Sequence, residues 1–76
     1  MYESNPELVE TLVNENHEFK TLFQRHRELD KQIDKAGVGQ MAISDESLEQ
    51  MKRERLQIKD RMYILIDAHR QDAATN

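Results

Sequence analysis

The sequence contains no cysteine and no tryptophan, and it has only one proline and two glycines. Without cysteine, the chain can form neither a disulfide nor a thiolate metal site, and it has no cysteine nucleophile. It also has no run of about 18 apolar residues, so we expect no membrane-spanning helix and no membrane partner. Residues 1–6 lack the basic start and the apolar stretch of a signal peptide. These absences lead us to expect a cytoplasmic protein.

Length, composition and charge narrow the possible classes of protein. The 76 residues suffice for one domain, residues 1–76. Apolar residues make up 37% of the chain and charged residues 34%, which is typical of an exposed helical or coiled-coil protein. The formal net charge of −4 argues against a general binder of nucleic acid or of anionic membranes, because such proteins are normally basic.

The first half of the chain carries one long apolar pattern without an internal proline or glycine. Asn5 suits the N-cap of a helix and Pro6 suits its first turn. The spacing then alternates between four and three residues, which is typical of a coiled-coil seam. The seam positions are Leu8, Leu12, Glu15, Phe19, Leu22, His26, Leu29, Ile33 and Ala36. This pattern predicts one continuous helix over about residues 6–35.

The two glycines separate this helix from a second one. Gly37 suits the left-handed residue that follows a helix end, and the hydroxyl of Ser44 can cap the next helix. We therefore expect a loop over about residues 36–44 and a helix over about residues 45–70. The second helix has its own seam, consisting of Leu48, Met51, Arg55, Ile58, Met62, Leu65 and His69.

Two seamed helices joined by a short loop must pair as antiparallel neighbours. We therefore predict an all-α fold, a two-helix antiparallel coiled-coil hairpin. Matching the seams from the loop outward sets Ile33 against Leu48, Leu29 against Met51, His26 against Arg55, Leu22 against Ile58, Phe19 against Met62 and Leu12 against His69.

Three seam positions are polar, namely Glu15, His26 and Arg55. Polar residues in a seam commonly fix its register, and we favour this role for His26. The alternative is a pH switch, because histidine changes its charge near neutral pH and Asp30 lies one turn away.

The sequence offers no catalytic or metal-binding arrangement. His17-Glu18 resembles the start of a zinc-protease motif, but Thr21 stands where the second histidine is required. Glu15 and His69 could meet at the far end of the hairpin, but two ligands do not make a metal site. We therefore expect no enzyme activity, no metal and no cofactor.

A basic cluster in the second helix supports the alternative function. Its members are Lys52, Arg53, Arg55, Lys59 and Arg61. They could contact phosphate, which would make the protein a small nucleic-acid-associated regulator. At about 100° per residue, however, they point in several directions, so we favour a solvated, salt-bridged surface.

Apolar residues beside the two seams predict an interaction face. These residues are Val9, Val13, Phe23, Leu56, Tyr63 and Ile66. They suit the packing of one hairpin on another, which leads us to expect a homodimer of hairpins forming a four-helix assembly. The preferred function is thus a coiled-coil interaction module that binds itself or another helical protein. In the alternative, these residues only widen the contact within one hairpin.

The residues also resemble those of a known family. In the first helix the resemblance rests on Asn14-Glu15-Asn16, Phe19, Leu22-Phe23, His26, Leu29-Asp30 and Ile33. In the second it rests on Met51-Lys52, Leu56, Lys59-Asp60 and Met62. Over about residues 8–66 the chain is similar to the YdcH-like family of small bacterial proteins of unknown function. This resemblance implies a helical hairpin and supplies no catalytic residues.

Overall fold

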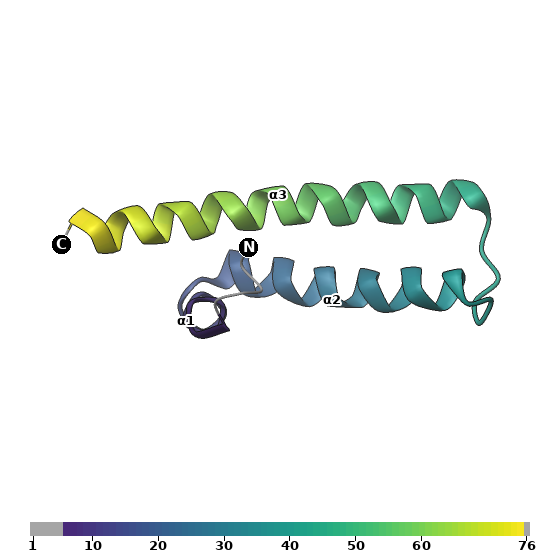
Figure 1. Cartoon of the computed structure of the whole chain (residues 1–76), viewed down its shortest axis with the longest axis horizontal. Coiled ribbons are helices and arrows are strands. Elements are labelled where there is room, and N and C mark those ends of the chain that lie inside the picture. The colour runs from purple at the N-terminus through teal and green to yellow at the C-terminus, as the bar shows by residue number, and fades with distance from the viewer. Residues whose placement is uncertain (1–5, 76) are drawn as a thin grey trace.

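The computed structural model describes the backbone of residues 6–75 and the side chains of residues 6–71. This part of the chain forms three helices, α1 (Pro6–Glu15), α2 (His17–Gly37) and α3 (Asp45–Thr75). Helices α2 and α3 lie side by side and antiparallel, joined by a loop at one end (Figure 1). The predicted all-α fold with hairpin-like packing is confirmed. Helix α3 is longer than the predicted range of about 45–70.

The prediction of one continuous helix over residues 6–35 is wrong, because the chain turns at Asn16. Figure 1 shows α1 almost end-on, turned away from the direction of α2. Asn16 has an extended backbone (φ −124°, ψ 110°), and its side-chain oxygen accepts a hydrogen bond from the backbone N–H of Phe19. Asn16 is thus the N-cap of a new helix. Asn5, the predicted N-cap of the first helix, lies outside the described residues.

The loop uses the second glycine, not the first, for its left-handed residue. Gly37 is the last residue of α2, whereas Gly39 has φ +78°. The N–H of Gln40 donates to the carbonyl of Lys35 over 2.8 Å, which closes the helix end. The predicted role of Gly37 is therefore wrong. The predicted cap at Ser44 is confirmed, since its hydroxyl accepts a hydrogen bond from the N–H of Ser47.

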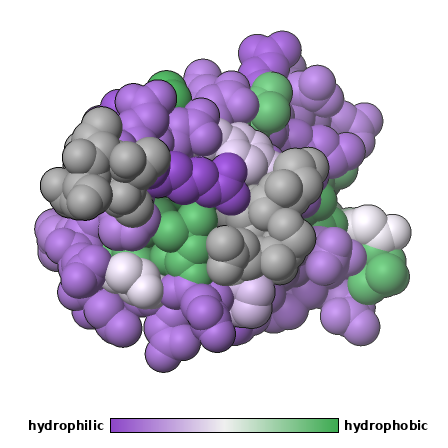
Figure 2. Space-filling model, turned by 60° about the vertical axis from the view of Figure 1, so that its left-hand side comes forward, coloured by the Kyte–Doolittle hydropathy of each residue, from purple (hydrophilic) through white to green (hydrophobic). Residues whose placement is uncertain are grey.

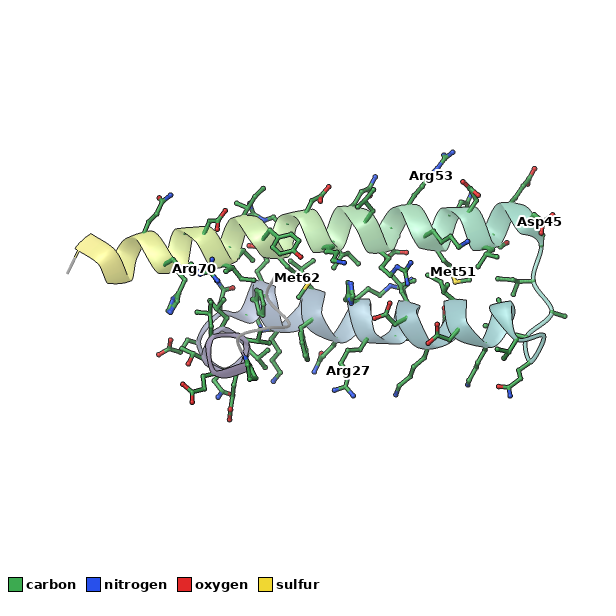
Figure 3. All side chains as sticks on the ribbon, viewed as in Figure 1. Arg27, Asp45, Met51, Arg53, Met62 and Arg70 are labelled. Atoms are coloured by element: carbon green, nitrogen blue, oxygen red, sulfur yellow. The ribbon has the colours of Figure 1, made fainter. Side chains whose placement is uncertain are left out.

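All three helices contribute to a single apolar core. Its buried members are Leu12, Phe19, Leu29, Ile33, Ile58, Met62 and Ile66. Figure 3 shows Met51 and Met62 pointing from α3 toward α2, whereas Arg53 points away from it. The protein is elongated, with extents of 50 × 20 × 18 Å and a radius of gyration of 14.6 Å. A compact chain of this length would have a radius of gyration of about 11 Å.

Ion pairs on the surface of the hairpin agree with the predicted register. Arg25 of α2 donates to Glu54 of α3. Closer to the start of α2, Glu18 accepts from Arg61.

Within the described residues, none of the helices combines the length and the hydrophobicity that a membrane-spanning segment requires.

Candidate functional site

Two of the three predicted polar seam residues lie together between α2 and α3. His26 is 8% exposed, and its Nδ1 lies 3.3 Å from Oδ2 of Asp30. Asp30 also accepts a 2.9 Å hydrogen bond from Nη1 of Arg55 on α3. Asp30 therefore connects His26 to Arg55, a role that we did not predict. Its position four residues after His26 is the signal in the sequence, because side chains at that spacing meet on a helix.

These residues line an open hollow of about 340 Å³ between the two helices. Its walls are formed by His26, Asp30, Lys52, Arg55, Leu56 and Lys59. Three lysine or arginine side chains face one carboxylate here, in a chain whose net charge is −4. The lining of the hollow therefore carries more positive than negative side chains.

The structure divides the predicted basic cluster. Lys52, Arg55 and Lys59 share the hollow. Arg61 is held by Glu18, and Arg53 points away from α2 (Figure 3). The five side chains therefore do not form one continuous basic surface.

The third predicted polar seam residue, Glu15, lies at the other end of the hairpin. It is exposed, and with Leu12 and His69 it lines a smaller hollow of about 190 Å³. Leu12 and His69 were paired in the predicted register, and they do lie together. Within residues 6–71, no group of three or more histidine or acidic side chains is arranged to hold a metal ion.

Two bidentate pairs at the surface shift the pKa values of the groups that form them. The hydrogen bonds from Arg61 lower the pKa of Glu18, and those from Arg25 lower the pKa of Glu54. The same hydrogen bonds raise the pKa values of Arg61 and Arg25. These pairs hold α2 against α3, and neither lines the hollow beside His26.

The structure separates the six residues of the predicted interaction face. Ile66 is 1% exposed, so it belongs to the core of the single chain. Four residues are half-buried and pack against that core: Val9, Val13, Phe23 and Tyr63. Leu56 is 59% exposed. Only part of the predicted face is therefore open to a partner.

Other large apolar side chains reach the surface in separate places. Ile64 of α3 is 56% exposed and Val38 of the loop is 71% exposed. On the face shown in Figure 2, hydrophobic residues form small areas within a mostly hydrophilic surface.

Comparison with the profiles of known families gives a match over most of the hairpin. The chain matches no curated protein and no solved structure. Residues 19–66 match the profile of a family described as a protein of unknown function (DUF465). The match covers nearly all of α2, the loop and most of α3 but does not include Asn14-Glu15-Asn16, where we also saw a resemblance. The description of the family names no catalytic activity. Because the match covers more than half of the chain, this protein belongs to the DUF465 family, the YdcH-like small proteins of unknown function.

Proposed function

We propose that this protein is an interaction module that pairs with a second copy of itself through an exposed face of α3 that includes Leu56 and borders the hollow beside His26. The observation that carries this proposal is the exposure of Leu56, at 59%, in the middle of a helix. Tyr63 lies two turns further along the same face, and its side chain is half-buried. Together they form a short line of apolar side chains that is at least partly exposed to water in a single chain.

The thinness of the core supports this proposal. In the described part of the chain, the buried apolar side chains of all three helices form one small cluster. Small chains with little core gain stability when a partner buries more apolar surface. A second copy would supply this surface without any other protein.

Sedimentation equilibrium at micromolar concentration tests self-association. We expect the parent to form dimers and Leu56→Glu to dissociate them, because a carboxylate would enter the apolar part of the contact. Val38→Glu is the control, since it places the same charge on another exposed apolar residue, in the loop. A folded parent with the mass of one chain would contradict the proposal and leave Leu56 and Tyr63 as a docking face for a different helical protein.

The hollow beside His26 favours a second candidate, a nucleic-acid-associated regulator. Lys52, Arg55 and Lys59 converge there, although Asp30 already neutralises Arg55. Retention of the purified protein on immobilised DNA and RNA tests this function. Retention that falls steeply as salt rises would support phosphate binding, whereas no retention at low salt would exclude it.

A further inference from the structure

One exposed face of α3 carries charges whose signs are reversed when the face is read in the opposite direction. A line of residues seven apart runs along this face: Glu49, Leu56, Tyr63 and Arg70. Charged residues flank the line on both sides: Lys52, Arg53, Lys59, Asp60 and Asp67. We call these nine residues the outer stripe. All of them are exposed or half-buried.

Among the described side chains, the ion pairs of the hairpin do not use the charges of the outer stripe. Within residues 6–71, the ion pairs join Arg25 to Glu28 and Glu54, Asp30 to His26 and Arg55, and Glu18 to Arg61. None of these pairs includes a residue of the outer stripe. Solvation alone would explain exposed charges in any order. It does not explain the particular order of positive and negative residues along this face.

From Glu49 to Lys59 the charges of the stripe are one negative followed by three positive. From Asp60 to Arg70 they are two negative followed by one positive. Reading the stripe backwards therefore exchanges positive for negative along most of its length. A helix with this property is complementary to an antiparallel copy of itself.

We propose that two copies of the protein pair antiparallel along α3, about a two-fold axis that passes between Lys59 and Asp60. This proposal rests on the self-pairing proposed above and adds the orientation and register of the two helices. Because the interface is two-fold symmetric, every contact occurs twice.

In this register each part of the stripe meets its complement. Leu56 lies level with Tyr63 of the second copy, so the two apolar residues of the line meet. Lys52 and Arg53 lie beside Asp67 of the second copy. The outermost residues also match, because Glu49 lies level with Arg70 of the second copy.

Other arrangements of the two helices lose this match. In a parallel pair each residue faces its own copy, so Lys52 and Arg53 would face lysine and arginine. In an antiparallel pair centred on Leu56, Arg53 would lie beside Lys59 of the second copy and Glu49 beside Tyr63. Exposed ion pairs contribute little affinity, but mismatched like charges are costly. The charge order therefore selects the register, while the apolar contact supplies the attraction.

Two charge-reversal variants test the register. The first is Lys52→Asp/Arg53→Asp, and the second is Asp67→Lys. In the proposed register each variant alone places like charges beside each other twice, so its dimer dissociation constant should rise on the order of ten-fold or more. An equimolar mixture of the two should regain parental affinity, since both contacts in the mixed dimer then join opposite charges.

The second variant separates register from net charge. Asp67→Lys brings the net charge of −4 closer to zero, which alone would strengthen association. The proposed register predicts instead that this variant associates more weakly than the parent. The control is Lys20→Asp/Lys31→Asp, which makes the same charge change as the first variant on exposed positions of α2. Its affinity should change much less, and circular dichroism should show that every variant folds.

The outcomes distinguish the two proposals. A parent that stays monomeric contradicts self-association and the register with it. A dimeric parent whose two variants each associate normally, or whose mixture is not restored, contradicts the register alone. At about 1 M salt, where the Debye length is near 3 Å, the differences between the variants and the parent should largely disappear. Differences that persist unchanged at that salt concentration would also contradict the register.

Discussion

Arg61 binds Glu18 through two hydrogen bonds, of 2.8 Å from Nε and 3.1 Å from Nη2, although 43 residues separate them in the chain. Arg25 binds Glu54 in the same bidentate way, over 2.8 and 3.0 Å. The direction is reversed, since α3 supplies the arginine in the first pair and α2 supplies it in the second. A slip of α3 along α2 would break both pairs, so these contacts specify the register of the hairpin more than they add to its stability.

The two pairs predict how stability depends on pH. The pKa values of Glu18 and Glu54 are lowered, so their contribution is present above the usual glutamate value of about 4.3. It is lost as the pH falls through the lowered values, because the carboxylates become protonated. Glu18→Gln/Glu54→Gln should therefore melt below the parent at neutral pH and together with it in strong acid. Thermal melts followed by circular dichroism measure this difference.

A matched control removes one carboxylate from the exposed surface of α1, in the variant Glu10→Gln. Its melting temperature should follow that of the parent across the pH range more closely than the double variant does. If the double variant and the parent differ equally at neutral and acid pH, the arginine contacts do not act through the charge of the carboxylates.

The spacing of Phe19, Leu29, Ile58 and Met62 was sufficient to predict a helical hairpin and the residues at its centre. It was not sufficient to reveal the turn at Asn16, for a physical reason. The N–H of Asn16 still donates to the carbonyl of Leu12, and the N–H of Lys20 donates to the carbonyl of Asn16. Hydrogen bonds between residues four apart, as in a helix, thus continue on both sides of the turn, and the four-and-three spacing of apolar residues is not interrupted there. The missed signal is an N-capping residue directly before the new helix, with the acidic Glu18 in its first turn.

Spacing in the sequence does not show which residues beside a seam become buried in the fold. Leu56 and Ile66 both lie beside the seam in the sequence, yet Leu56 is exposed and Ile66 is buried in the core that also contains Leu12 of α1. His26 and Arg55, which face each other in the predicted register, both line one hollow.

Asn16→Ala should weaken the turn between α1 and α2. The variant loses the hydrogen bond of 3.0 Å to the N–H of Phe19, which should cost about 1 kcal/mol of the free energy of unfolding. It should also shift some molecules toward a straight helix. Spin labels at Glu7 and Gln24 measure this change, because in a continuous helix these positions lie about 25 Å apart along the axis.

The control for this prediction is Asn14→Ala, which changes the same residue type at an exposed position inside α1. The parent and Asn14→Ala should give the same, shorter distance between the labels. Equal distances in all three proteins would mean that core packing, and not the cap, determines the turn.

The two glycines of the loop should respond in opposite ways to alanine. Gly39 has φ +78°, where a Cβ atom is strained, so Gly39→Ala should lower the free energy of unfolding by about 1–2 kcal/mol. Gly37 ends α2 with nothing within 4 Å of an added Cβ, so Gly37→Ala should raise it by up to about 1 kcal/mol. Urea denaturation of both variants measures these changes. The reverse order would mean that the left-handed residue is Gly37, as its place after the seam first suggested.

Asp30→Asn should affect both stability and the charge of the hollow beside His26. Asp30 is the carboxylate that binds Arg55 and approaches His26, and it is partly exposed. Its loss should lower the free energy of unfolding by about 1 kcal/mol or less, as expected for an exposed ion pair. It should also leave Lys52, Arg55 and Lys59 without an opposing carboxylate in the hollow.

Asp34→Asn is the control, because Asp34 is exposed one turn further along α2 and does not line this hollow. If the hollow binds phosphate, Asp30→Asn should increase salt-sensitive retention on nucleic acid more than Asp34→Asn, although both variants make the same change in net charge. Equal retention of the two variants would show that net charge alone governs binding, and it would remove the structural support for the nucleic-acid candidate.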